Sequence, residues 1–249
     1  MSFHLAAYSA SVDQAALAAI AAVADPSLTV SGNNIQIPDF APFLMGAYAN
    51  GVNISRAQLQ SPSLRRVVNP EIRPVDVSVT PTTNPDMMDL FKNPIKLDVS
   101  EQMQGFTAES GAGATRMNLF VWLGDGKTDI ITDQIFSVRC TGATTLTAFN
   151  WTNGQMVFDQ VLPVGDYAIV GARCESAGLI GFRFVFQGST PRPGGIGVTG
   201  PGLFDPKNQR FGGWGVWGVF NSTTPPTVDY FSSSADSAEI FSLDLIRIG

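Results

Sequence analysis

The sequence predicts an all-β fold, an antiparallel β-sandwich, with a single α-helix near the N-terminus. Two observations lead to the sandwich. From Leu28 onward, short segments in which apolar and polar residues alternate follow one another, separated by turn residues. The strand–helix alternation that is typical of a parallel sheet does not occur in the sequence. With 249 residues, of which 44% are hydrophobic, the chain is long enough to bury a sizeable core.

The helix is predicted between Ala15 and Ala24. Ser11-Val12-Asp13-Gln14 has the Ser-x-x-Gln form of a capping box, and Asp25-Pro26 ends the segment. Leu17 and Ile20 lie on its apolar face. We expect this face to pack against the β body or a neighbouring subunit. Contact with an internal membrane through the helix is an alternative, although the polar face lacks the Lys and Arg of interfacial helices.

The stretch 144–188 carries the strongest short-range signal. Asn153-Gly154 stands between two alternating segments, and both residues tolerate the positive φ of a type I′ hairpin turn. Turn residues at 161–166 and 176–178 separate two further segments, so four consecutive strands in an antiparallel meander are predicted. Asn50-Gly51 is a second hairpin candidate of the same kind.

The domain organisation follows from these elements. Residues 1–27 form the predicted N-terminal arm and helix, with the first ten extended or mobile, and residues 28–249 form the β body. An internal division of that body is considered near 80–115, where two connections rich in Pro, Gly and Ser occur. About a dozen predicted strands suit a jelly roll, either single with insertions or a compact double one.

Charge is scarce on this chain. Lys, Arg, Asp and Glu make up 14% of the residues, against roughly 25% in ordinary globular domains. Either the surface is neutral, or much of it is subunit interface, where charged residues are depleted. The net charge of −6 and the absence of a Lys/Arg-rich tail argue against direct nucleic-acid binding, because phosphates must be neutralised by cations.

Cys140 and Cys174 lie in predicted strands, and we expect two buried free thiols because a chain of this size needs no disulfide. The apolar run at 15–24 is too short to span a bilayer, and no basic segment precedes it. We therefore expect a soluble protein without a secretion signal.

No catalytic, cofactor-binding or metal site is predicted. His4 is the single histidine and lies in the predicted mobile terminus, whereas Ser-His-Asp, Cys-His and most zinc sites need a positioned imidazole. The run Gly195–Gly200 matches G-x-G-x-x-G, but Pro201 follows it, so no helix can begin there. Asp125, Asp129 and Asp133 fit a solvated turn better than a calcium loop.

Two weaker possibilities for function remain open. Carboxylates for glycosidic cleavage are available, although their spacing singles out no pair; they are Glu101, Glu109, Asp159, Asp166 and Glu175. Trp side chains could stack on sugars, although core or interface packing explains them more simply; they are Trp122, Trp151, Trp214 and Trp217.

Candidate contacts with other subunits lie on the helix face, at the predicted Asn-Gly turn, in the Pro/Gly-rich loop 189–213 and in the aromatic segment 214–220. Long loops in compact domains often carry an interaction. The candidate interface residues are Leu17, Ile20, Asn153, Gly154, Pro193, Trp214 and Trp217.

From Leu28 onward, in its many predicted strands, few charged residues and long Pro/Gly-rich loops, the chain resembles viral capsid proteins of the jelly-roll type. The segments most similar to capsid strands are Asn118–Leu123, Tyr167–Arg173, Ala177–Phe186 and Glu239–Ile248. The resemblance implies a structural protein of a virion that assembles with copies of itself and with other capsid proteins. The sequence lacks the Arg-rich arm of small RNA-virus coats, which fits phage shells in which an internal membrane or another protein handles the genome.

The alternative is an extracellular carbohydrate- or receptor-binding β-sandwich, suggested by the apparent exposure of Trp214 and Trp217. A carboxylate-dependent glycosidase is a third hypothesis.

Overall fold

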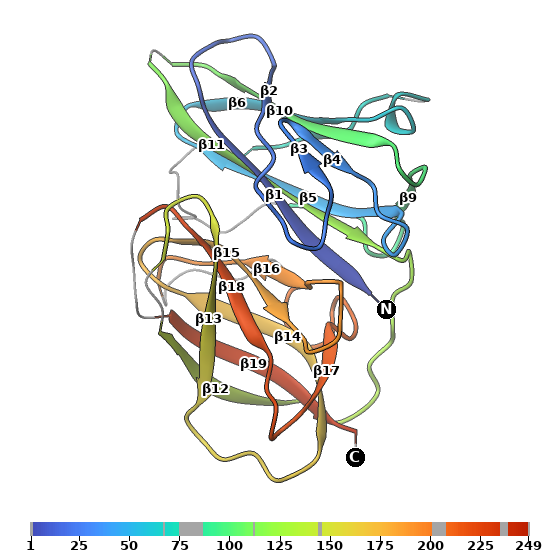
Figure 1. Cartoon of the computed structure of the whole chain (residues 1–249), viewed down its shortest axis with the longest axis vertical. Coiled ribbons are helices and arrows are strands. Elements are labelled where there is room, and N and C mark those ends of the chain that lie inside the picture. Colours follow the sequence, from blue (N-terminus) through green and yellow to red (C-terminus); the bar gives the residue numbers. More distant parts are fainter. Residues whose placement is uncertain are drawn as a thin grey trace. The chain divides into compact units, whose positions relative to one another are not determined.

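The computed structural model describes residues 2–66, 68–74, 87–111, 113–143, 146–200, 208–234 and 239–248. These residues form β-strands and one short 3₁₀ helix, η1 (Leu64–Arg66), so the all-β prediction is confirmed (Figure 1). None of the described helical segments is long and apolar enough to cross a membrane. The chain divides into an N-terminal unit, His4–Gly126, and a C-terminal unit, Lys127–Gly249 together with Met1–Phe3. The boundary between the units, at Gly126 and Lys127, lies after the range 80–115 in which the sequence suggested a division of the β body.

The N-terminal unit contains two sheets among its described residues. One has the order β1-β11-β5-β8, with β9 also pairing with β5; the other has the order β3-β4-β10-β6-β7, with β2 also pairing with β10. The first sheet consists of β1 (Phe3–Val12), β11 (Thr115–Gly124), β5 (Phe43–Gly51), β8 (Met88–Asp89) and β9 (Ile95–Lys96). The second consists of β2 (Ala18–Ile20), β3 (Val30–Ser31), β4 (Asn34–Gln36), β6 (Ile54–Gln60), β7 (Glu71–Ile72) and β10 (Gln102–Glu109).

The core of this unit lies between the two sheets. Alternate residues of β11, from Met117 to Leu123, are buried in one hydrophobic cluster with Leu59 of β6 and Met103 of β10. This is the period-two pattern of a strand with one face on a core. Each such side chain contributes about 1.5–3 kcal/mol when it is fully buried.

The predicted N-terminal helix is wrong. Strand β1 runs through the predicted cap at Ser11, and β2 pairs with β10 so that Ile20 lies opposite Gly105. Ile20 is buried in the core, and a Cβ on Gly105 would lie 3.0 Å from the Tyr8 ring. Helix propensity is a weak preference that sheet packing overrides here. The suggested membrane contact therefore has no helix to carry it.

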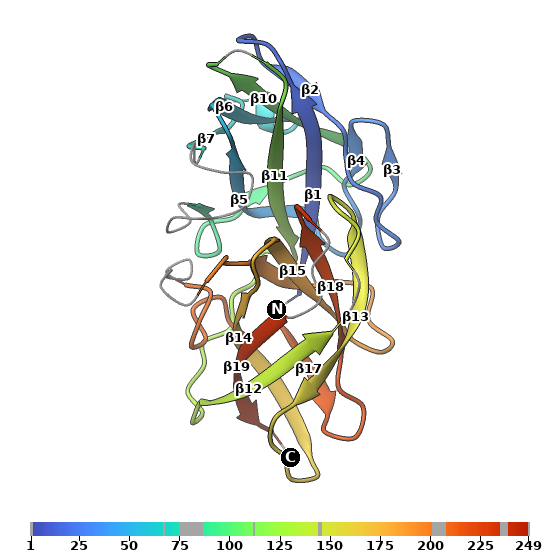
Figure 2. The same cartoon turned by 90° about the vertical axis from the view of Figure 1, so that its left-hand side faces the viewer.

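The C-terminal unit has one continuous hydrogen-bonded order, β16-β15-β18-β13-β12-β19-β14-β17. Strand β13 joins the two halves of this order, because residues 151–154 pair with β18 and residues 155–158 pair with β12 (Figure 2). The strands are β12 (Phe136–Ala143), β13 (Trp151–Phe158), β14 (Asp166–Glu175), β15 (Leu179–Val185), β16 (Gly194–Ile196), β17 (Gly218–Asn221), β18 (Thr227–Ser232) and β19 (Glu239–Arg247).

The predicted hairpin and meander are also wrong. Asn153-Gly154 lies inside β13, at the point where this strand changes partner, and β14 pairs with β17 and β19 instead of with β13 or β15. A glycine suits such a bend because it has no Cβ. Asn50-Gly51 likewise ends strand β5, and the turn residue with positive φ is Asn53. Strands β5 and β6 then enter different sheets.

Both cysteines are free and buried, as predicted. Cys140 of β12 and Cys174 of β14 are each the direct partner of Phe241 on the strand between them. Aromatic rings dominate the core around this position: the Phe182 and Phe241 rings are 5.6 Å apart, edge to face. Such pairs add about 0.5–1.5 kcal/mol beyond the area that they bury.

Candidate interaction surfaces

The aromatic segment that supplied two candidate interface residues, Trp214 and Trp217, packs both of these rings in the core. Trp214 is 0% exposed and Trp217 is 3% exposed. Their rings stack with centroids 5.8 Å apart, and the Phe3 ring packs edge-on against both, at 6.4 and 5.5 Å. These side chains form part of the core of the C-terminal unit. They present no ring surface for a sugar or for another subunit.

The other predicted contact residues differ in their exposure. Ile20, Gly154 and Pro193 are buried, Leu17 is half-buried and Asn153 is exposed. The Pro193 carbonyl accepts a hydrogen bond from the Phe184 amide, 2.7 Å away, so the start of the Pro/Gly-rich loop is held against the sheet. Of these residues only Asn153, and Leu17 in part, present side chains to solvent.

Asn153 belongs to a row of polar side chains that crosses the sheet. Its amide donates to the Asp229 carboxylate over 2.9 Å, and the Arg183 Nε donates to the same carboxylate over 3.0 Å. Arg192 donates to it as well. The Arg183 guanidinium lies 4.1 Å from the Trp151 ring centroid, a cation–π contact. Because the Arg183 side chain is 0% exposed, this row is a structural tether between strands.

Asp244 anchors a second polar cluster in the same unit. It accepts two hydrogen bonds from Arg210, one from Ser137 and one from the Phe211 amide, at 2.6–2.9 Å. Burial alone raises the pKa of Asp244, but these donors outweigh it and leave the pKa below its ordinary value. Gly171 makes room for the cluster, since a Cβ there would lie 2.6 Å from the carboxylate. The carboxylate fixes the loop that carries Arg210.

His4 was predicted to lie in a mobile terminus, and that prediction is wrong. It is buried in β1, and its Nε2 lies 2.8 Å from the Asp25 carboxylate, which also accepts the Ser27 amide. Nothing in this pair is open to solvent, since the two side chains are 0% and 2% exposed. The pair ties the segment after β2 to β1.

The candidate carboxylates are spread over both units and serve local contacts. Glu109 is buried in β10. The other four accept hydrogen bonds from neighbours, namely Ser61 and Ser63 for Glu101, Arg139 for Asp159, Asn221 for Asp166 and Arg173 for Glu175. In the described part of the chain, no three His, Cys, Asp or Glu side chains gather where they could hold a metal ion.

The G-x-G-x-x-G run has a packing role. Its first residues belong to β16, and a Cβ on Gly195 would lie 2.5 Å from the Gln209 side chain. The Gln209 amide donates to the carbonyls of Ala172 and Ile196, each over 3.0 Å, and accepts the Ile196 amide. The buried amide thus bridges β14 and β16. Sequence reasoning missed it because a single Gln gives no signal.

An apolar hollow lies in the described part of the N-terminal unit. This apolar pocket is lined by Ser63, Leu64, Val68, Pro70 and Ile95 and has a volume of about 370 Å³. Val68 is 71% exposed and Ile95 is 37% exposed, although both are large hydrophobic residues. An exposed apolar hollow of this kind is typical of a binding surface.

Hydrogen bonds hold the wall of the apolar pocket in place. The Ser61 hydroxyl accepts the Leu64 amide at the start of η1, and the Glu101 carboxylate accepts both the Ser61 hydroxyl and the Ser63 amide. The Ser63 hydroxyl in turn accepts the Asp98 amide over 3.0 Å. The pocket is therefore preformed.

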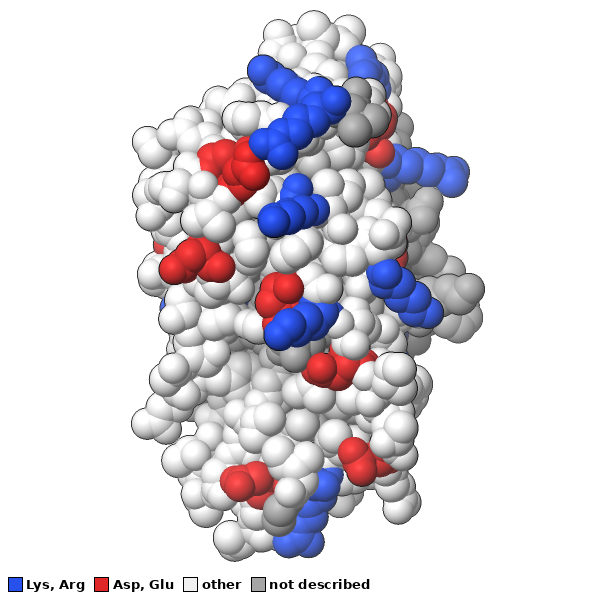
Figure 3. All heavy atoms as spheres, turned by 90° about the vertical axis from the view of Figure 1, so that its right-hand side faces the viewer, with Lys and Arg blue, Asp and Glu red and all other residues white. Residues whose placement is uncertain are grey.

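Basic residues accompany the apolar pocket. Arg65 and Arg66 follow its residue Leu64, and Lys96 follows its residue Ile95; all three side chains are exposed. Lys and Arg side chains gather on the N-terminal unit in the view of Figure 3. Arg66 is paired with Asp98.

The C-terminal unit carries an exposed apolar segment of its own, residues 157–164, which we call the valine loop. Val157 is 62% exposed, Val161 97% and Val164 76%. The loop is held by hydrogen bonds from the Tyr167 hydroxyl to the Pro163 carbonyl, 2.8 Å, and from Arg247 to the Val164 carbonyl, 3.1 Å. Exposed valines on a fixed loop place apolar side chains in water, which is unfavourable unless a binding partner covers them.

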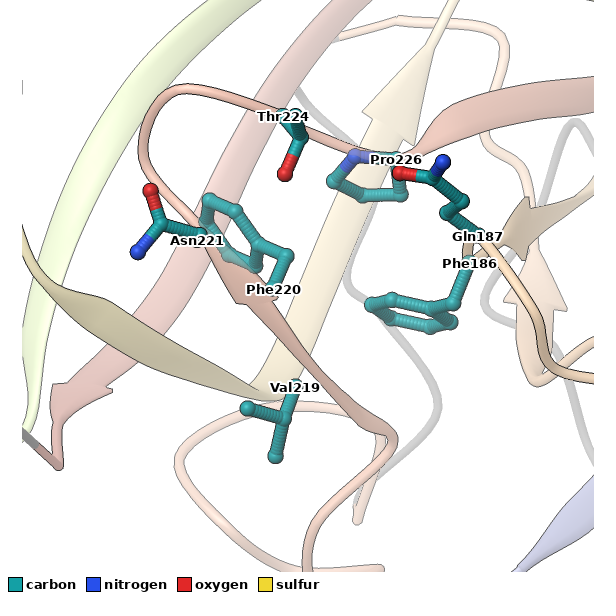
Figure 4. Close-up of a pocket in the computed structure, with 7 residues that line it drawn as sticks. All are labelled: Phe186, Gln187, Val219, Phe220, Asn221, Thr224 and Pro226. Atoms are coloured by element: carbon teal, nitrogen blue, oxygen red, sulfur yellow. The ribbon is translucent and has the colours of Figure 1, made fainter.

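Two polar hollows also lie on the surface of the described residues. The one in Figure 4 is small, about 150 Å³, and lies between the end of β15 and the turn after β17. Its Asn221 side chain is already bound to Asp166 and Thr223. A second hollow of about 240 Å³ in the N-terminal unit is lined mostly by amides and one guanidinium; its residues are Asn34, Gln60, Ser61, Pro62, Arg65, Gln102 and Gln104.

The described residues thus define an all-β protein of antiparallel sheets whose polar clusters are structural. No protein-family model and no curated protein sequence matches the chain. Among solved structures it is similar to the crystal structure of the major capsid protein P2 from bacteriophage PM2. That match covers 97% of this chain and 98% of the phage protein, with 10% identity and a TM-score of 0.23, values too low to establish a shared function.

Proposed function

We propose that each unit is a jelly roll and that the chain is a double jelly roll. In the C-terminal unit, β12 to β19 numbered one to eight give the order 5-4-7-2-1-8-3-6. In the N-terminal unit, we treat β3 and β4 as an inserted hairpin and β8 with β9 as one interrupted strand. The remaining strands can then also be numbered one to eight in chain order. Its sheets then read 5-4-7-2 and 1-8-3-6. The same two sheets, built from two Greek keys, support the same fold in both units.

We propose further that this double jelly roll is a structural subunit of a virus shell and acts without catalysis. The repeated strand order carries this proposal, because jelly rolls of two Greek keys are the fold of viral capsid domains. A shell subunit needs several surfaces that contact other copies. A charged fraction of 14% and two exposed apolar surfaces, one on each unit, suit that requirement. The proposed location is the virion.

The proposal is tested by the assembly state of the purified protein. We expect its mass from light scattering after size exclusion to rise with concentration, and electron microscopy to show regular capsomers or shells. A protein that stays monomeric at every concentration and in every salt tested is not a shell subunit.

A second candidate function, glycan binding, is favoured by the amide-lined hollow of the N-terminal unit. Amides donate and accept at once, which matches sugar hydroxyls, and lectin domains also use the jelly roll. Gln104 donates to Asn34 over 2.9 Å at this hollow, and Arg65 donates to Gln60 over 2.8 Å. A glycan array tests it: hits that Gln104→Ala abolishes would support it, and an empty array would remove it.

A further inference from the structure

We propose that the valine loop of one copy docks into the apolar pocket of a second copy. This inference rests on the proposed shell function and names the two surfaces that would join its subunits. The occupant of the pocket would be residues 157–164 of the neighbouring chain, with Val161 as the inserted side chain.

The placement of exposed apolar residues is the first argument. In a jelly roll, successive strands run in opposite directions, so the connections 2–3, 4–5 and 6–7 meet at one end of the unit. The valine loop is connection 2–3 of the C-terminal unit, and Val68 lies in connection 4–5 of the N-terminal unit. Val99, 50% exposed, lies in connection 6–7 of that unit. The two surfaces therefore occupy corresponding ends of their units.

Shape is the second argument. The apolar pocket is a preformed hollow of about 370 Å³, and the valine loop is a fixed protrusion whose tip residue Val161 is 97% exposed. The hollow is roomy enough for one aliphatic side chain and its backbone neighbours. A concave surface fits a protruding side chain better than it fits the flat face of a bilayer.

Charge is the third argument. Arg65 and Lys96 are exposed and follow the pocket residues Leu64 and Ile95 in the chain, and Lys96 has no ion pair within the described residues. On the other surface, Asp159 and Asp166 lie on either side of Val161; Asp159 is paired with Arg139, whereas Asp166 accepts a hydrogen bond from the uncharged Asn221. The charges of Asp166 and Lys96 are opposite, so they attract each other. The same acidic residues oppose binding of the loop to an anionic membrane.

The consequence is a heterologous contact, in which different surfaces of two identical chains meet. Contacts of this kind build rings or extended arrays instead of closed pairs. Each copy then offers one loop and one pocket, so a chain with one surface removed can end an array but cannot extend it.

The experiment uses two variants of the full chain, Val161→Asp and Val68→Asp. Both side chains are more than two-thirds exposed, at 97% and 71%, so both variants should fold. We expect each alone to need at least about tenfold more protein for assembly than the unmodified chain, because an apolar contact is lost. Ile130→Asp, at an 89% exposed position outside both surfaces, is the matched control and should assemble normally.

Mixing the two variants gives the decisive result. Val161→Asp keeps an intact pocket and Val68→Asp keeps an intact loop, so a mixture should form 1:1 heterodimers at concentrations where neither variant assembles alone. Variants that assemble like the unmodified chain, or a mixture that stays monomeric, would overturn the inference and leave the shell function standing. An unmodified chain that never assembles would instead overturn the shell function. Flotation with phosphatidylglycerol vesicles that Val68→Asp abolishes, while assembly is unchanged, would assign the pocket to a membrane and overturn the inference.

Discussion

Cys140 and Cys174 lie on either side of strand β19, each directly opposite Phe241. Two strand spacings of about 4.8 Å separate their backbones, beyond the range of roughly 4.4–6.8 Å that a disulfide bridges. Burial, aided by the Asp159 charge, raises the pKa of Cys140 to about 12. Both thiols are therefore expected to resist oxidation and alkylation.

A thiol titration checks this prediction. Ellman's reagent should find no reactive cysteine in the native protein and two after denaturation, and non-reducing mass spectrometry should show no disulfide. Two reactive thiols in the folded chain would contradict the placement of both residues in the core.

The ion pair between Arg183 and Asp229 should be costly to break. Arg183→Met leaves the Asp229 carboxylate buried with fewer donors, and we expect a loss of about 3–5 kcal/mol in the free energy of unfolding. Arg139→Met removes an exposed pair with Asp159 and should cost at most about 1 kcal/mol. Denaturant unfolding followed by circular dichroism measures both. Equal losses would show that burial of the first pair has no energetic weight.

The Asp244 cluster predicts a pH dependence with a definite sign. Its pKa is lower in the folded chain than in the unfolded one, so the carboxylate adds stability above its ordinary pKa near 3.8. That stability is lost as the pH falls through the folded pKa. Asp244→Asn should therefore be less stable than the unmodified chain near neutral pH, and the difference should shrink as the pH falls below about 4.

Urea unfolding between pH 3 and 7 measures this difference. Asp13→Asn, at an exposed position, is the control and should leave stability nearly unchanged across the range. A gap between Asp244→Asn and the unmodified chain that widens toward low pH would contradict the prediction.

Phe3 should contribute strongly to the C-terminal unit. Its ring is 0% exposed and contacts both Trp214 and Trp217, so Phe3→Ala should cost about 3–5 kcal/mol. Tryptophan emission during unfolding reports the loss. Phe211→Ala, at a 63% exposed ring, is the control and should cost much less. A Phe3→Ala variant whose free energy of unfolding is unchanged would contradict the packing described for this ring.

Alternation along the chain predicted individual strands well. The apolar segment Met117–Leu123 lies within β11, and the final segment from Glu239 matches β19 to within one residue. Side chains that alternate between core and solvent leave this pattern whatever the partner strand is.

Partners and surfaces could not be predicted in the same way. The meander assumed that consecutive strands pair, whereas here β13, β14 and β15 follow one another along the chain and none pairs with the next. Asn153-Gly154 was predicted to be a turn. A glycine occurs both at bends within a strand and at turns between two strands, and the sequence does not distinguish the two cases.

The helix and the aromatic segment failed for a related reason. Alanine favours a helix, but its small side chain also fits a closely packed strand, so the alanine-rich run around Ile20 was mistaken for a helix. In the Trp214–Trp217 pair, the Trp217 ring packs against Phe3 and Phe182. Contacts between residues far apart in the chain could not be predicted from the local sequence pattern.

Phe3 packs in the C-terminal unit, whereas the chain from His4 to Gly126 builds the other unit. During synthesis, Phe3 leaves the ribosome long before Trp214 and Trp217, which lie more than 200 residues later in the sequence. The first unit can acquire its own core in the meantime, but the second is completed only when its last strands meet a residue made at the start. A chain released before residue 214 would therefore leave the Phe3 ring without the two Trp rings that it packs against.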